Sequence, residues 1–272
     1  MAKSIARPNY FGSNGEVVRT GVDAGGYDFL YTKSTTKDPV YNIGDRVALP
    51  DGRVFRYCKS GGACYPGQGN VFYNAIPATG IDYSVLPAAA ALGARSIQMT
   101  NQGTVAQTLD GLKGGEIILK PASGSTNGEL QMRGIIGNTA GGVSDVITIY
   151  LDAPLTEALT TASYAFCMPS PYSDIRQSGG DSGEVTFAGV AAVEVTASGY
   201  YFWLQTKGLC WLAPQSGVGA TAYYRTAYWR HDGSVDIFTN IGTYVTDQIA
   251  GVIIDNNSAA NGATLISLQC DY

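Results

Sequence analysis

The first strong strand signal in the pattern of apolar and polar positions falls at residues 46–58. Asp51-Gly52 lies between two short runs rich in apolar residues, and an Asp-Gly pair in that position is typical of a two-residue type I′ turn. On the strand after the turn, Phe55 and Tyr57 are two residues apart and therefore share one face. The pattern predicts a β-hairpin over residues 46–58.

Further short runs, apolar or alternating and mostly bounded by Gly, Asn or Asp, continue to the C-terminal end. They predict strands at Ser96–Thr100, Thr104–Leu109, Glu116–Lys120, Glu129–Ile136, Asp145–Leu151, Glu184–Ala197, Tyr200–Thr206, Leu209–Leu212, Ala222–Arg230, Ser234–Thr239, Gln248–Asp255 and Thr264–Cys270. Only Pro87–Ala94 has helical propensity, and because it is too short for a stable helix, a loop or a strand remains open there.

Strands at this spacing, with no clear crossover helices, favour antiparallel sandwiches or barrels. We therefore expect an all-β protein with two antiparallel β-barrel or sandwich domains and an extended N-terminal arm. The arm with its hairpin would take residues 1–80, the first domain 81–175 and the second 176–272, with the turn-rich stretch 171–183 between the domains. Residues 1–43 are polar and aperiodic, which fits either a loose tail or an arm lying on a neighbouring subunit.

Composition supports many turns and a real core. Glycine accounts for 35 of the 272 residues, and 45% of the residues are hydrophobic. Glycine is costly inside helices and useful where the backbone turns with positive φ, so its abundance agrees with short strands rather than long helices.

Charge and hydropathy exclude two classes of partner. The formal net charge is −5 and the basic residues are spread singly, whereas a nucleic-acid-binding protein needs a clustered basic face. No apolar stretch reaches the roughly 18 residues of a transmembrane helix, and residues 1–16 have no apolar signal-peptide core. We expect no nucleic-acid or membrane partner, and a protein made in a cytosol.

The five cysteines are odd in number and widely spaced along the chain. In a reducing compartment they are expected to be buried thiols rather than a disulfide framework. Cys58 and Cys64 flank a Gly-Gly turn and could pair, but no further residues are spaced to complete a zinc site. We therefore expect no metal and no cofactor.

Candidate catalytic groups are sparse. Gly180-Asp-Ser-Gly183 resembles the surroundings of a chymotrypsin-like nucleophile, yet the single histidine, His231, follows it in the chain, whereas that family places its histidine first. His231 also precedes the Asp232-Gly233 turn and is expected to be exposed. Acidic residues could form a pair in space, but no sequence context marks one. The sequence thus predicts no catalytic residues and a protein that is not an enzyme.

Aromatic residues are concentrated near the C-terminal end, beginning with the run Tyr200–Trp203. About half of the side chains on any strand face away from the core. These rings could therefore stabilise a sheet by cross-strand pairing, form a protein interface, or stack on sugars.

Two segments resemble known virion proteins. Gly44–Tyr57, with the Lys-Ser-Gly-Gly turn that follows shortly after, resembles the N-terminal region of virion structural proteins of tailed phages. Ala188–Ala191 together with Gly199–Gly208 is similar to a segment of phage head decoration (cement) proteins, in which a Gly-Val-Ala strand leads through a turn to a strand ending in Gln-x-x-Gly.

The resemblance implies a non-enzymatic viral structural protein that decorates and stabilises a phage capsid, located on the capsid exterior of the virion. Its expected partners are the major capsid protein of the same virion and copies of itself, as a trimer. The alternative is a carbohydrate- or receptor-binding module of a virion fibre or spike. Exposure arguments select the protein-contact residues Ile5, Pro8, Tyr10, Phe11, Tyr201, Trp203 and Trp229.

Overall fold

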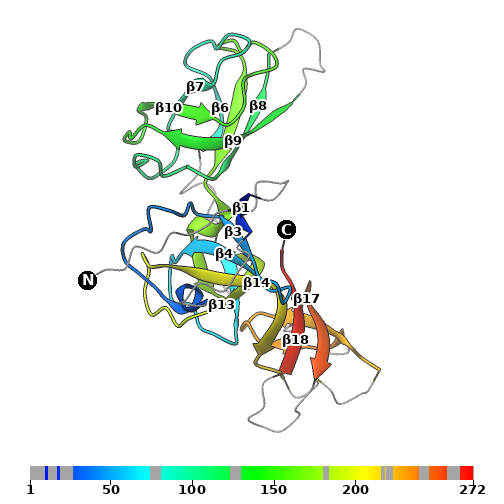
Figure 1. Ribbon diagram of the computed structural model, residues 1–272. Coiled ribbons are helices and arrows are strands. Elements are labelled where there is room, and N and C mark those ends of the chain that lie inside the picture. The colour runs from blue at the N-terminus through cyan, green and yellow to red at the C-terminus, as the bar shows by residue number, and fades with distance from the viewer. Residues whose placement is uncertain are drawn as a thin grey trace, which may run out of the picture. The chain divides into compact units, whose positions relative to one another are not determined.

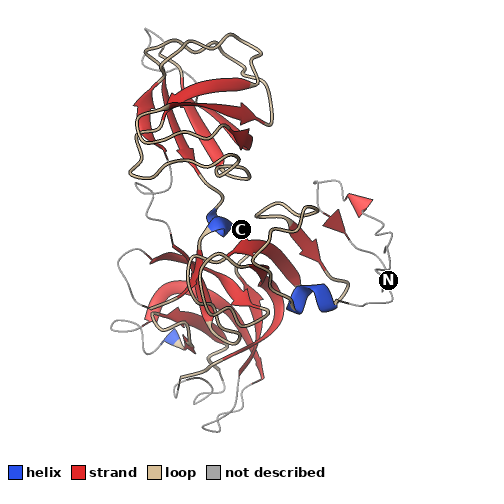
Figure 2. Ribbon diagram, turned by 90° about the vertical axis from the view of Figure 1, so that its left-hand side faces the viewer, coloured by secondary structure: helices blue, strands red, loops and turns tan. Residues whose placement is uncertain are grey.

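The computed structural model describes residues 10–11, 17–18, 27–73, 81–122, 130–179, 184–215, 218, 223–238, 245–255 and 264–271. The chain forms two compact units. Residues 74–171 make up one of them, which we call the inserted unit. The other, which we call the split unit, combines residues 1–73 with residues 172–272. Strands dominate both units, and the described helical elements are short 3-10 turns (Figure 2).

The inserted unit is a curled, barrel-like antiparallel sheet (Figure 1). Its strands are β6 (Ile81–Val85), β7 (Ser96–Thr100), β8 (Glu116–Lys120), β9 (Gln131–Asn138), β10 (Val146–Leu151) and β11 (Tyr164–Met168). They are ordered β6-β11-β8-β9-β10-β7. Alternate residues point inward, so Ile117 and Leu119 of β8 are fully buried while Glu116 and Lys120 are exposed.

The split unit contains the larger sheet. Its elements are β1 (Tyr10–Phe11), β2 (Val17–Val18), η1 (Asp28–Tyr31), β3 (Arg46–Ala48), β4 (Val54–Lys59), β5 (Gly69–Tyr73), β12 (Ile175–Gln177), β13 (Glu184–Ala191), β14 (Tyr201–Leu212), β15 (Thr226–Arg230), β16 (Val235–Asp236), β17 (Val245–Asp255) and β18 (Thr264–Gln269), with η2 (Pro171–Ser173) at the junction. The main path runs β1-β2-β3-β4-β14-β18-β17-β15-β16, while β13 pairs with β14 and β5, and β12 pairs with β5.

The expected all-β, antiparallel fold is confirmed, since β2 and β3 form the one parallel pair among the described strands. The division of the chain differs from the expected boundaries. The hairpin and β5 share a sheet with the C-terminal strands instead of belonging to a separate N-terminal region. Long-range pairing of β4 with β14, almost 150 positions apart in sequence, causes this grouping, and local patterns carry no information about it.

The strand β14 is longer than the sequence indicated. The strands expected at 200–206 and 209–212 are one strand of 12 residues. Gly208 lies between them with a φ of 89°, and the register with β4 shifts between Gln205 and Lys207. A bulge thus carries the strand through a glycine that the sequence suggested was a break.

The predicted hairpin at residues 46–58 is present, but its turn is of another type. The N–H of Gly52 donates to the carbonyl of Leu49 at 3.0 Å, and the N–H of Leu49 donates to the carbonyl of Arg53 at 2.8 Å. Gly52 has a φ of 86°, whereas Asp51 is not left-handed as a type I′ turn requires. Pro50, whose ring fixes φ near −65°, therefore opens a three-residue loop that ends in a left-handed glycine.

One other expectation from the pattern is corrected, and one open alternative is decided. Thr104–Leu109 is not a strand, because its only sheet contact is an isolated bridge from Gln107 to Gly141, and Leu109 is 70% exposed. Pro87–Ala94, where a loop or a strand remained open beside a helix, is a loop with one bridge, from Ala90 to Leu159. Both segments connect strands of the inserted unit and have no continuous partner strand.

The chain passes into and out of the inserted unit through neighbouring positions. On the split unit, the N–H of Tyr73 donates to the carbonyl of Asp174 at 3.0 Å, where β5 pairs with β12. On the inserted unit, its first and last strands, β6 and β11, pair with each other. An insertion whose two ends lie close together leaves the host fold intact, because a short turn could connect the same two host strands in its place.

We therefore expect each unit to fold without the other. A chain in which residues 74–171 are replaced by a short Asn-Gly linker, and the isolated segment 74–171, should each give a β-sheet circular-dichroism spectrum and one cooperative thermal transition. If either piece is unfolded while the intact protein is folded, the two units depend on each other and the expectation is wrong.

Candidate functional site

The residues expected to make contacts fall into three groups. Ile5 and Pro8 lie outside the described residues. Tyr10 and Phe11 form the two-residue strand β1, which pairs with β2. The other three, Tyr201, Trp203 and Trp229, belong to β14 and β15 of the split unit.

The two tryptophans are not surface residues. Trp229 is fully buried and stacks on Phe187 with ring centroids 4.7 Å apart and planes 12° from parallel. Trp203 is only 3% exposed. Their selection as exposed contact residues is therefore corrected. The first half of β14 is covered on both faces, so alternation could not distinguish an exposed set there, whereas Trp229 lies on the inward side of β15, where buried and half-buried residues alternate.

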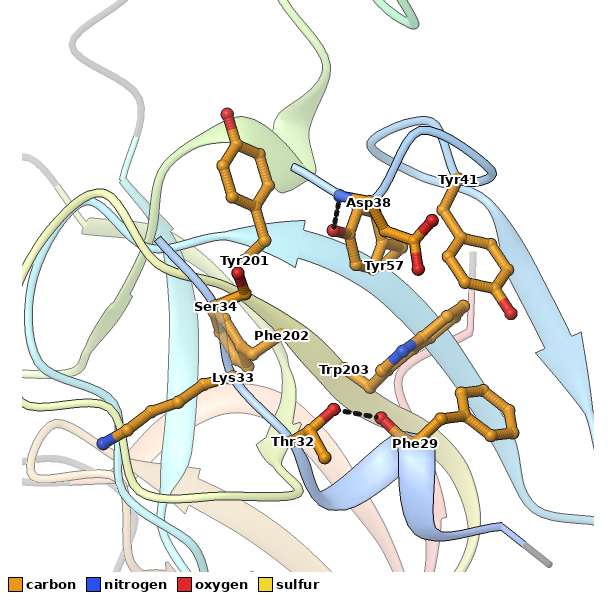
Figure 3. A pocket seen from close by; sticks show the side chains of 10 residues that line it. All are labelled: Phe29, Thr32, Lys33, Ser34, Asp38, Tyr41, Tyr57, Tyr201, Phe202 and Trp203. Carbon is orange, nitrogen blue, oxygen red and sulfur yellow. Dashed lines mark hydrogen bonds between the residues drawn. The ribbon is translucent and has the colours of Figure 1, made fainter. Parts of the chain in front are cut away.

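Tyr201 and Trp203 instead line a small aromatic pocket (Figure 3). The pocket has a volume of about 80 Å³. It is lined by Phe29, Thr32, Lys33, Ser34, Asp38, Tyr41, Tyr57, Tyr201, Phe202 and Trp203. By this measure a single water molecule needs roughly 10–15 Å³, so the pocket has room for a small group of a ligand.

Trp203 is the centre of the ring contacts in this pocket. Tyr41 meets it edge-on at 4.9 Å, Phe29 edge-on at 5.6 Å, and Tyr57 at a tilt at 5.2 Å, all between ring centroids. Tyr201 stacks on Tyr57 at 6.0 Å. Such ring pairs add roughly 0.5–1.5 kcal/mol each beyond the burial of their area, so the pocket wall is rigid.

Residues 27–45 supply one wall of the pocket. This segment follows an extended path with one 3-10 turn, η1, and lies on the sheet of its own chain. Ser34 and Tyr201 exchange backbone hydrogen bonds of 3.0 and 2.7 Å, and Leu30 is fully buried. This part of the N-terminal region is therefore held by its own unit.

The polar groups of the pocket are fixed by the backbone. The N–H of Asp38 donates to the hydroxyl of Tyr57 at 3.0 Å, and the Asp38 carboxylate accepts from the N–H of Val40 at 2.8 Å. Burial raises the pKa of Tyr57, and the Asp38 charge raises it further, although the hydrogen bond from the Asp38 backbone opposes this. Lys33 points away from the rings at the centre and donates to the carbonyl of Glu194 at 2.7 Å.

The groups considered for catalysis are only partly covered by the described residues. His231 is exposed at the turn before Asp232-Gly233, as expected. The Gly180–Gly183 tetrapeptide lies outside the described residues. Among the residues that the structure describes, no three His, Cys, Asp or Glu side chains gather as a metal site would require.

All five cysteines are free and buried, as the sequence indicated. Cys58 and Cys64 both lie in one core cluster with Phe202 and Ile175, without a bond between them. Burial raises the pKa of Cys64, Cys167, Cys210 and Cys270 to about 12, and raises that of Cys58 well above its ordinary value.

A second feature is an exposed apolar surface on the C-terminal strands, which we call the C-terminal apolar face. It consists of Leu209, Trp211, Tyr228, Phe238, Ile249, Val252, Ile254 and Leu265. Trp211 is 54% exposed and lies opposite Leu265 in the β14–β18 pair. Val252 lies opposite Ser267 of β18 and Thr226 of β15, so the surface extends across four neighbouring strands.

The residues that define both features were not predicted from the sequence. Tyr41 and Phe29 were absorbed into an aperiodic stretch, although aromatic residues in a polar segment are themselves a signal that the segment packs on something. Trp211 was not among the predicted contact residues. Its neighbours Cys210 and Leu212 are buried, and this alternation within 209–212 marks Trp211 as the outward residue.

Comparison with known proteins adds no family to this description: no family model, curated protein or solved structure matches the chain. No helix among the described residues is both long and apolar enough to cross a lipid bilayer.

The buried thiols give a direct test of the core. At pH 8 the folded protein should react with a thiol reagent such as dithionitrobenzoate at a negligible rate, because a thiol with a pKa near 12 is only about one part in ten thousand thiolate. The same sample in guanidinium chloride should release five equivalents. Rapid reaction of any cysteine in the folded protein contradicts the burial described here.

Proposed function

We propose that this chain is a non-enzymatic viral structural protein that decorates and stabilises a phage capsid. The observation that carries the proposal is the C-terminal apolar face, which presents a tryptophan and seven other apolar or aromatic residues on a rigid sheet. Exposed apolar patches of this kind mark protein interaction sites in soluble proteins. Tryptophan is also the residue type most enriched among those that dominate binding energy.

The rest of the molecule supports a binding role over a catalytic one. The most reactive side chains, the thiols, are buried and protonated, and the one histidine is at an exposed turn. The resemblance of Gly44–Tyr57 and Gly199–Gly208 to virion proteins supports the same reading. The proposed partner of the face is the major capsid protein of the same virion, on the outer side of the shell.

Attachment to a shell also fits a contact made through one sheet face per chain. A capsid presents many identical sites, so a protein that binds as an oligomer, such as the trimer implied by the resemblance, gains from multivalency. Modest contacts at each site then suffice, and one exposed sheet face per chain can provide them. The formal net charge of −5 keeps the unbound protein soluble despite that face.

Replacing Trp211 with Ser should weaken attachment to shells. The change removes an exposed ring and leaves the buried neighbours Cys210 and Leu212 in place, so the fold is retained while the contact is lost. The concentration for half-saturation of shells assembled from the major capsid protein of the same genome should rise by about tenfold or more. Co-sedimentation with those shells measures it.

The matched control is Tyr223→Ser, because Tyr223 is 91% exposed in a turn before β15 and is not part of the face. This variant should bind shells like the unaltered protein. Equal binding by all three proteins contradicts attachment through the face, and absence of binding by the unaltered protein contradicts the proposed function.

The aromatic pocket supports a second candidate, a carbohydrate- or receptor-binding module of a virion fibre or spike. Sugars stack on aromatic rings, and Tyr201 presents a ring at the edge of the pocket, next to the polar groups of Ser34 and Asp38 (Figure 3). The small volume fits a ligand that rests on Tyr201 and inserts one substituent among the rings.

Glycan binding would make Tyr201 the decisive residue. If the alternative holds, the protein binds members of a glycan array, and Tyr201→Ala abolishes the signal while Tyr223→Ala keeps it. Tyr201 is half-buried and its backbone bonds to Ser34 do not depend on its ring, so the variant should fold. A blank array for the unaltered protein removes this candidate.

A further inference from the structure

The inserted unit has an outward apolar row that the proposed function does not use. In the register of the sheet, Phe166 of β11 lies opposite Ile118 of β8, and Ile118 lies opposite Met132 of β9. These three side chains point away from the core. The residues next to Ile118 along β8, Ile117 and Leu119, are fully buried inside the barrel-like sheet, and side chains alternate along a strand. Met132 is 57% exposed, and Ile118 and Phe166 are half-buried.

Charges of opposite sign flank this row at equal distances along β8. The outward residues of the strand are Glu116, Ile118 and Lys120, so the acid is two residues before the isoleucine and the base two residues after it. Both charged side chains are exposed. Gly134, opposite Glu116, lies against the carboxylate of Asp152, which adds a second acid at that end of the face.

This arrangement is complementary to itself. Two copies of the face can meet about a two-fold axis that passes between their Ile118 residues, perpendicular to β8. The two β8 strands then run in opposite directions. Glu116 of each copy then faces Lys120 of the other, and the apolar rows meet at the centre. Any symmetric pairing of this kind uses the same patch on both partners, which is the commonest contact in homo-oligomers.

We propose that the inserted unit pairs with a second copy of this chain through this face, which we call the β8 face (Glu116, Ile118, Lys120, Met132 and Phe166). Sheets that pack face to face align their strands within about 30° and lie roughly 10 Å apart, a distance that glutamate and lysine side chains span. The two opposite-charge pairs set the antiparallel direction, since a parallel arrangement would place like charges together.

The β8 face makes a two-fold contact, which differs from the trimer expected from the resemblance and involves residues other than those of the C-terminal apolar face. Neither contact requires the other. The test of the β8 face is therefore independent of whether the chain binds a capsid.

The experiment uses charge reversal in the full chain and sedimentation velocity across a range of concentrations. The unaltered protein should show a reversible monomer–dimer equilibrium that weakens as salt is raised. Glu116→Lys and Lys120→Glu should each raise the dissociation constant by about tenfold, since each creates two like-charge pairs per dimer. The double variant E116K/K120E should return it to within about threefold of the original value, because both pairs are restored with their signs exchanged.

Mixing the two single variants gives the sharpest result. One then carries Lys at both positions and the other Glu at both, so the mixture should form a heterodimer more tightly than either variant forms a homodimer. Each change shifts the formal net charge of −5 by two, to −3 and −7, so both variants remain negative overall. A general attraction between oppositely charged proteins therefore does not explain such a heterodimer.

Controls separate the face from surface hydrophobicity in general. Ile118→Ser should weaken the dimer, whereas Leu92→Ser should not, because Leu92 is 66% exposed in a loop of the same unit, outside the sheet. Thermal unfolding confirms that each variant is folded. A protein that is monomeric up to about 100 µM overturns the proposal, as does a dimer that E116K/K120E fails to restore.

Discussion

The pairing of β14 is the constraint on which the split unit depends. Its 12 residues bond to β4 over the first half and to β18 over the second, and β13 pairs with it near the middle. Each of the three core clusters in the split unit also contains residues of this strand: Trp203 in the first, Phe202 and Leu204 in the second, Cys210 and Leu212 in the third. A disturbance of β14 therefore reaches the N-terminal aromatic cluster and the C-terminal strands together.

Two glycines allow close approach between neighbouring strands of the split unit, β13 to β14 and β17 to β18. Gly189 of β13 and Gly251 of β17 have φ values of 149° and 154°, and a side chain at either would meet a carbonyl oxygen of the adjacent strand, at 2.3 Å from Gln205 and 2.0 Å from Ser267. Both lie in the three-residue sequence Ala-Gly-Val, at 188–190 and 250–252, and in both places the strand bends closely over its neighbour. The Gln248 amide then bridges both backbone groups of Phe187, at 2.7 and 2.8 Å, where β13 has no backbone partner on β17.

The sequence was informative where structure is set locally and uninformative where it is set by distant pairing. Alternation placed Ser96–Thr100 and Glu116–Lys120 at their true bounds, and the glycine-containing turns at 51–52 and 232–233 were located although the type of the first was wrong. Alternation could not reveal that Trp203 is covered by residues 27–45, since that segment has no period of its own. Nor could it reveal the insertion between β5 and β12, which depends on strands about 100 residues apart.

The insertion also places the two proposed contact surfaces on units with separate cores. Because β5 and β12 meet at adjacent positions, the inserted unit can vary without altering the hydrogen bonds of the host sheet, and its own core shares no residue with the clusters around β14. Apolar side chains on its outer face, such as the exposed Met132, are not part of any core cluster. In the pairing proposed for the β8 face, the Glu116–Ile118–Lys120 order favours an antiparallel arrangement of the two β8 strands, because a parallel one would place like charges together.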